Sequence, residues 1–259
     1  MAAGLRPVAL STRAMKSIRS NRRRSIFPAC LAIFSTFLLL GIVRSDAAPA
    51  ANCPIPLETG NRWTYEAIVR WTAEDSGTHG PTKVHWTMEA LAVVTNASAR
   101  AVVVRGLPAE LTGYKPGLKP GYDVLLIAGN GVYRFEASTE GAASAKAREL
   151  LKTGNSGLAE ADELIALPLA RGKAWAGDTD RRDHWYCWHV EEEGRGRPRV
   201  KSSPVAGAVP TWLIAYRTNP DHQIMEIAEG LGITRYVYEH HGTVQSVDAR
   251  LVEFKRAGI

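Results

Sequence analysis

Apolar and polar residues alternate with a period of two through much of the chain after residue 60. In residues 62 to 71 one side is apolar and the other is mostly polar, and the apolar side holds Trp63, Tyr65, Ala67, Val69 and Trp71. This period is typical of a strand with one buried face. Residues 82 to 90 repeat it, and the intervening Asp75-Ser76-Gly77 reads as a turn, so the two segments predict a hairpin.

Further apolar segments separated by glycine, proline and asparagine predict a meander of strands. They cover residues 101–105, 124–128, 132–136, 184–191, 211–217, 223–228, 233–240 and 244–254. Residues 140–152 predict the one helix after the leader, because they are rich in alanine and leucine and hold no β-branched residue. The expected class is therefore all-β: an antiparallel meander curled into a half-barrel, sandwich or barrel, with one short helix.

A spaced pattern occurs twice in the chain. Pro56-Leu57-x-x-Gly60-x-x-Trp63 recurs as Pro168-Leu169-x-x-Gly172-x-x-Trp175, displaced by 112 positions throughout. In each copy the glycine is expected to take a positive-φ turn and the tryptophan to be the first inward side chain of a strand. The pattern predicts two related β units; chance is the alternative, because the residues after each tryptophan diverge.

The first fifty residues have the organisation of an export signal. The basic residues Arg22, Arg23 and Arg24 precede an apolar segment at residues 26–43, and Ala48-Pro49-Ala50 provides a cleavage site after Ala50. Residues 1–50 are therefore predicted to be a signal peptide. The eighteen residues of this segment also reach the lower limit for spanning a bilayer, so an uncleaved membrane anchor is the alternative. Both predictions place the domain at residues 51–259 outside the cytoplasm, as a periplasmic, secreted or membrane-anchored domain.

The leader also accounts for the net positive charge of the chain. The formal charge is +6, but residues 1–50 hold eight basic residues and one acid, a net of +7, which leaves −1 for the rest. Nucleic-acid binding needs clustered lysine and arginine that neutralise phosphates. The nearly neutral exported domain is therefore expected to bind no nucleic acid, and to contact the membrane only through an uncleaved leader.

Two cysteines remain after the leader, Cys53 and Cys187. An even number of cysteines in an oxidising compartment predicts a disulfide, which would tie the start of the domain to its middle. Two buried free thiols are the alternative.

At the repeated pattern the chain resembles a family of uncharacterised exported bacterial proteins. The resemblance rests on Pro-Leu-x-x-Gly-Asn-x-Trp-x-Tyr at 56–65, on Leu-Pro-Leu-x-x-Gly-x-x-Trp at 167–175 and on the Gly-x-Gly segment and aromatic strand at 230–238. It implies an antiparallel β architecture similar to the half-barrels of periplasmic lipoprotein carriers. It implies no activity, so no functional residue is carried over.

The densest group of reactive residue types is Asp183-His184-Trp185-Tyr186-Cys187-Trp188-His189. Because side chains alternate along a strand, Cys187 and His189 are expected to share a face that His184 leaves. A metal site would need further ligands from elsewhere in the chain besides these two. The sequence shows no second Cys/His cluster, so we predict neither a metal nor a cofactor. Trp185, Cys187 and His189 are instead candidates for lining a ligand cavity, with a central strand covered on both faces as the alternative.

Two loops contain residues that could bind an anion or act as a nucleophile. Arg195, Arg197 and Arg199 follow the acids at 191–193; they suit an anionic ligand, but a solvated hairpin tip of mixed charge is the favoured interpretation. Gly154-Asn155-Ser156-Gly157 lacks the Gly-x-Ser-x-Gly context of a nucleophilic serine, so no catalytic residue is assigned.

These patterns favour a non-catalytic exported β domain. It would bind an apolar or amphipathic, lipid-like small ligand, or another component of the envelope. The alternatives are a secreted hydrolase whose serine and histidine are brought together only by the fold, and a structural envelope protein.

Overall fold

The computed structural model describes residues 52–73, 77–154, 157–158, 161–219, 221–240 and 244–258. The leader, with its expected cleavage site at Ala50, lies outside this part of the chain. Twelve strands, one α-helix and one 3₁₀ helix follow in the order β1 (Arg62–Ala73), β2 (Gly77–Thr95), β3 (Ala99–Arg105), η1 (Pro108–Gly113), β4 (Tyr122–Ala128), β5 (Gly131–Ala137), α1 (Glu140–Thr153), β6 (Asp162–Ala166), β7 (Ala174–Gly177), β8 (Cys187–Gly196), β9 (Val209–Arg217), β10 (His222–Ala228), β11 (Gly232–Glu239) and β12 (Val244–Lys255).

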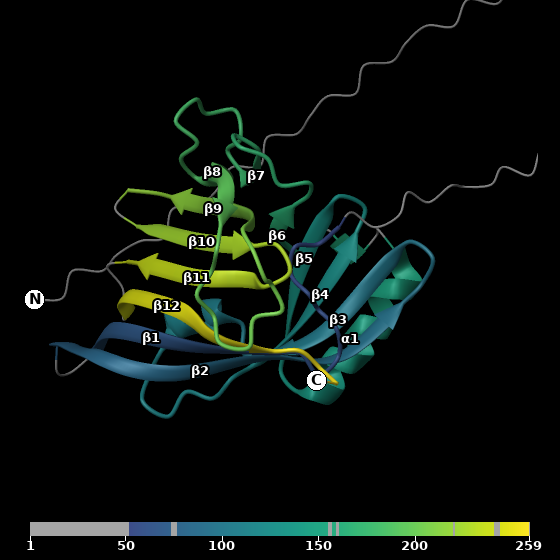
Figure 1. Cartoon of the computed structure of the whole chain (residues 1–259), viewed down its shortest axis with the longest axis horizontal. Helices are drawn as coiled ribbons and strands as arrows, with labels where there is room; N and C mark the ends of the chain where they lie inside the picture. The colour runs from purple at the N-terminus through teal and green to yellow at the C-terminus, as the bar shows by residue number, and fades with distance from the viewer. Residues whose placement is uncertain are drawn as a thin grey trace, which may run out of the picture. The chain divides into compact units, whose positions relative to one another are not determined.

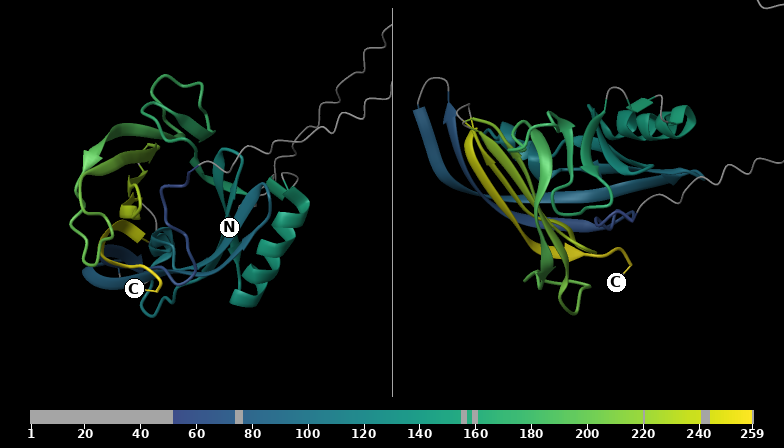
Figure 2. Two further views of the ribbon diagram at one scale, coloured as in Figure 1. Left: turned by 45° about the vertical axis from the view of Figure 1, so that its right-hand side comes forward. Right: turned by 90° about the horizontal axis from the view of Figure 1, so that it is seen from above.

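All twelve strands form one antiparallel sheet in the order β6-β5-β4-β3-β2-β1-β12-β11-β10-β9-β8-β7. The chain therefore runs from the middle of the sheet at β1 to one edge at β6. It then passes to the opposite edge at β7 and returns to β12, which pairs with β1. Because the sheet twists and curls, the edge strands β6 and β7 approach each other and the sheet becomes a nearly closed barrel (Figures 1 and 2). The predicted all-β class is confirmed.

The helix α1 packs against the outer face of β3, β4 and β5 (Figure 2). It begins at Thr139, whose hydroxyl accepts a hydrogen bond from the backbone N–H of Ala142 at 3.1 Å. Ala143, Ala147 and Leu150 are its buried residues. These strands are therefore covered on both faces, which explains why the segment at 101–104 is continuously apolar instead of alternating.

The interior of the barrel is the main hydrophobic core. Trp63 and Tyr65 of β1 are fully buried, and both also donate hydrogen bonds across the interior. The indole of Trp63 donates to the carbonyl of Leu231 at 2.6 Å, and the hydroxyl of Tyr65 donates to the carbonyl of Ile233 at 2.9 Å. Trp63 and Tyr65 thus tie the first strand to the start of β11.

The first copy of the repeated pattern lies immediately before β1. Gly60 has φ +88°, in the left-handed region that favours glycine, and its N–H donates to the carbonyl of Ala90 in β2. The N–H of Ala90 in turn donates to the carbonyl of Asn61. The side-chain amide of Asn61 donates to the carbonyl of Pro56 at 2.6 Å. Trp63, two residues on, is the first buried tryptophan of the half-sheet β1–β6.

The second copy repeats this geometry before β7. Gly172 has φ +80°, its N–H donates to the carbonyl of Val190 in β8, and the N–H of Val190 donates to the carbonyl of Lys173. The ammonium of Lys173 reaches the carbonyl of Pro168 at 3.1 Å, as the amide of Asn61 reaches Pro56. Trp175 is 4% exposed. Each half of the sheet therefore opens with the same hydrogen-bonded turn, which supports two related six-stranded units over a chance repeat.

Three elements differ from the sequence expectation. The predicted strand at 184–191 begins only at Cys187, because His184 and Tyr186 have positive φ angles of +54° and +62°. The five-residue strand β6 was not expected, whereas the four-residue strand β7 contains Trp175, which the repeated pattern predicts at the start of a strand. β2 begins at Gly77, earlier than predicted. The turns expected at 75–76 and 241–242 lie outside the described residues.

Candidate ligand-binding cavity

A cavity of about 470 Å³ lies between η1 and the inner faces of β5 to β11. Most of its wall is aromatic or aliphatic: Leu107, Ala109, Leu164, Ala176, Trp188, Tyr216, Met225, Ile233, Tyr236 and Tyr238. The rings of Trp188 and Tyr216 are 5.4 Å apart between centroids and form one continuous surface on β8 and β9. A volume of this size, with apolar walls, suits a small molecule.

The polar residues of the cavity include Arg134, on β5. Its Nε donates to Asp123 at 2.8 Å and its Nη2 to Glu136 at 2.8 Å. Asp123 is 1% exposed. Burial raises the pKa of this carboxyl, while the Arg134 charge and hydrogen bond act in the opposite direction. Burial lowers the pKa of Arg134, but its acidic neighbours outweigh burial and keep the guanidinium charged.

Two further acids, Asp162 and Glu163 of β6, lie in the same wall. On β10, Gln223 accepts a hydrogen bond from the hydroxyl of Tyr236 at 3.1 Å. The cavity is thus amphipathic: a mostly apolar body that also contains an arginine, two carboxylates and an amide. The lining therefore offers both hydrogen-bonding groups and apolar surface within one cavity.

The gap between β6 and β7 borders this cavity. No backbone ladder joins these two edge strands in the described residues. The indole of Trp175 on β7 donates instead to the carbonyl of Glu163 on β6 at 3.1 Å. Residues on both sides of the seam also line the cavity, Leu164 on β6 and Ala176 on β7. A single side-chain bridge is weaker than a ladder, so this seam is the least tightly joined part of the barrel wall.

The three residues expected to line a cavity lie elsewhere. Trp185, Cys187 and His189 are all absent from the lining, whereas their neighbour Trp188 belongs to it. Trp188 and Val190 pack against the barrel core, so Cys187 and His189 are on the other face of β8. Cys187 is fully buried and His189 is 7% exposed. Trp185 precedes the strand and forms an isolated bridge with Arg217.

The positive-φ segment before β8 brings together two histidines that alternation would separate. The rings of His184 and His189 stack with centroids 5.0 Å apart. Burial lowers the pKa of His189, and the neighbouring Glu191 opposes this shift. Among the described residues, no three histidine, cysteine or acidic side chains are placed to hold a metal ion.

The two cysteines are free thiols in the structure, which does not support the predicted disulfide. Cys53 precedes β1, next to Pro54, whose carbonyl accepts from Gly230 in the β10–β11 turn. Burial raises the pKa of the Cys53 thiol to about 11. Cys187 starts β8, where its thiol contacts the carbonyl of His184 at 3.4 Å. Each thiol is thus held by different neighbours, and the count of cysteines alone could not show this.

The pair of Glu191 and Arg217 beside His189 predicts an acid-dependent loss of stability. Arg217 donates to both carboxylate oxygens of Glu191, at 2.6 and 2.8 Å, and these bonds lower the pKa of Glu191 from its ordinary 4.5, against burial. A carboxyl whose pKa is lower in the folded state stabilises the fold at pH values above its unfolded-state pKa. This stabilisation is lost as the pH falls through its folded-state pKa.

At pH 7 we therefore expect the free energy of unfolding of the wild type to exceed that of Glu191→Gln by about 1 kcal/mol. We expect this difference to disappear as the pH falls below about 4.5. Urea unfolding of both proteins between pH 7 and pH 3 measures this difference. Curves that stay parallel over that range would show that the ion pair does not contribute to acid sensitivity.

The fold and the cavity define a nearly closed antiparallel β-barrel with an internal amphipathic site. No known protein family matches the chain, and no curated protein matches its sequence. Two solved structures are similar to it at 11% identity. A predicted exported protein of Bacteroides fragilis with a YmcC-like fold gives a TM-score of 0.40 over 78% of this chain and 98% of its own. A predicted lipoprotein of Parabacteroides distasonis gives 0.38 over 79% and 99%. At these scores we transfer no function.

In the described part of the chain, no helix combines the length and the apolar character that crossing a membrane requires.

Proposed function

We propose that residues 51–259 form an exported, non-catalytic domain that binds an amphipathic small molecule in the barrel cavity. The leader sequence supports export, through its basic cluster, its apolar segment at 26–43 and the Ala-x-Ala site that ends at Ala50. One observation carries the binding proposal: the 470 Å³ cavity combines an aromatic and aliphatic wall with the Arg134 guanidinium.

The arrangement favours a ligand with an apolar tail and a polar head. Contact with Trp188, Tyr216 and Met225 would remove apolar ligand surface from water, at about 25 cal/mol per Å². A polar head would meet Arg134, whose guanidinium is 18% exposed. Asp123 and Glu136 already pair with this arginine, so a head that accepts hydrogen bonds without full charge suits the site better than a bare dianion.

Filling the cavity tests the proposal. Ala109 lines the cavity from η1, and Ala109→Phe places a ring into that space. Ala170→Phe is the matched control, because Ala170 is exposed and outside the lining. We expect a fluorescent amphiphile such as anilinonaphthalene sulfonate to bind the wild type and Ala170→Phe equally, and Ala109→Phe at least about tenfold more weakly.

A long-chain alcohol or monoacylglycerol should displace the probe from the wild type. Equal probe binding by both variants would place the probe outside the cavity and count against the proposal. Circular dichroism and a urea midpoint for each variant separate lost binding from lost folding.

A further inference from the structure

A second hollow lies on the outer face of the sheet, away from the barrel interior. Residues 197–201, here called the strap, leave β8 and cross in front of β9–β12 (Figure 1). The strap ends on β12, where the N–H of Lys201 donates to Val252 and the N–H of Phe254 donates to Lys201, at 2.9 and 3.0 Å. A groove of about 620 Å³ lies between the strap and the strands.

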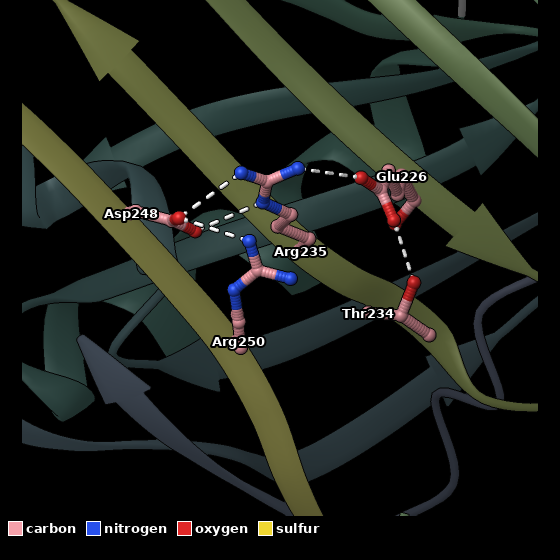
Figure 3. A network of polar contacts seen from close by, with 5 residues as sticks. All are labelled: Glu226, Thr234, Arg235, Asp248 and Arg250. Atoms are coloured by element: carbon pink, nitrogen blue, oxygen red, sulfur yellow. Dashed lines mark hydrogen bonds and ion pairs between the residues drawn. The ribbon is translucent and has the colours of Figure 1, made fainter. Parts of the chain in front are cut away.

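The floor of the groove is a cross-strand ion network (Figure 3). Arg235 on β11 donates twice to Asp248 on β12, at 2.9 and 3.0 Å, and once to Glu226 on β10, at 3.0 Å. Arg250 adds a contact to Asp248 at 3.1 Å. The two floor acids are therefore already neutralised by Arg235, and Arg250 keeps donors for a further partner.

The end of β8 and the strap add positive charge above this floor. Arg195, Arg197 and Arg199 line the groove, and Arg195 also donates to the carbonyl of Ala208 at 2.7 Å. Pro198 fixes the backbone between the other two arginines. Within the described residues, neither Arg197 nor Arg199 has an acidic partner at ion-pair distance.

The groove also contains acids. Two of them, Glu192 and Glu193, line it, and Glu193 accepts from the backbone of Arg171 at 3.1 Å. The indole of Trp212 on β9 belongs to the other face of the sheet, because its ring packs against the barrel core with Ile214. The donors of the groove are therefore arginines, which suit an oxyanion because guanidinium groups donate hydrogen bonds and carry positive charge.

We propose that this groove is a second binding site, which takes a phosphate or carboxylate group between Arg197, Arg199 and Arg250. The site is independent of the barrel cavity, because it lies on the opposite face of the sheet. The strap is thus more than the solvated hairpin tip that its sequence favours.

Titration with inorganic phosphate tests the site, with amide shifts in nuclear magnetic resonance as the readout. We expect the shifts to concentrate on the strap and on β9–β12 and to weaken as salt rises. Arg197→Gln with Arg199→Gln should weaken binding at least about tenfold. Arg182→Gln, which removes an exposed arginine outside the groove, should leave the affinity unchanged.

Two further arms identify the source of the anion and separate the sites. Cosedimentation with phosphatidylglycerol vesicles, but not with phosphatidylcholine vesicles, would assign a lipid headgroup; phosphate binding without vesicle binding would assign a free anion. Ala109→Phe should keep phosphate binding, since it alters only the cavity. Absence of phosphate-induced shifts in the wild type, or equal weakening by Arg182→Gln, overturns the proposal.

Discussion

Replacement of Trp63 by alanine should destabilise the domain by about 4 kcal/mol, the largest effect we expect from one side chain. Trp63 is fully buried, and its ring lies 5.1 Å from that of Phe254. Its removal would leave a cavity in the barrel core. It would also remove the hydrogen bond to the carbonyl of Leu231, which links β1 to the start of β11.

Urea unfolding monitored by circular dichroism measures the effect. Trp63→Phe keeps most of the packing but loses the indole donor, so we expect it to cost about 1 to 3 kcal/mol. Trp185→Ala is the control, since Trp185 is only half-buried and lies outside both hydrophobic clusters. A loss at Trp63 no larger than the loss at Trp185 would contradict this account of the core.

Asn61→Ala should cost about 2 to 4 kcal/mol, although asparagine contributes little apolar surface. The side chain is fully buried and has three partners. Its amide donates to the carbonyl of Pro56 and to the carboxylate of Glu58, at 2.6 and 2.8 Å. Its oxygen accepts from the N–H of Ala257 at 2.9 Å. Without it, a buried turn and the end of the chain both lose hydrogen bonds.

The internal repeat provides a matched comparison for this prediction. Lys173 occupies the position of Asn61 in the second copy, but its side chain is only partly buried and its ammonium can turn to water. Lys173→Ala should therefore cost less than about 1.5 kcal/mol in the same urea assay. If the two substitutions were equally destabilising, the buried network of Asn61 would not be the cause.

The alternating segments made the long strands predictable. At Trp63, Tyr65, Val69, Trp86 and Met88 the period of two matches the buried face. The short strand β6 was not predictable, because five residues give too little periodicity, and β7 was indicated only by the tryptophan of the repeated pattern. The repeat was visible as a spacing, but its meaning came from the matched backbone hydrogen bonds at Gly60 and Gly172.

The cavity was less predictable than the fold. Alternation puts Cys187 and His189 on one face of β8, as observed, but it does not show which face is inward, and Trp188 and Val190 occupy that face. Arg134 and Tyr236 join the site only because η1 and strands from both halves of the sheet surround one space. Aromatic residues at alternating positions, such as Tyr216, were visible in the sequence. Which face of each strand lines the cavity could be decided only from the strand register of the whole barrel.

Native mass spectrometry tests the central claim most directly, that the barrel cavity holds one amphipathic molecule. The full chain would be produced with its own leader in a bacterial host and purified from the envelope fraction without detergent, beside Ala109→Phe and Ala170→Phe. We predict that the wild type and Ala170→Phe carry, or take up from a lipid extract, one small amphipathic molecule per chain, and that Ala109→Phe does not. A bare polypeptide mass for the folded wild type, even after incubation with the extract, would contradict the account.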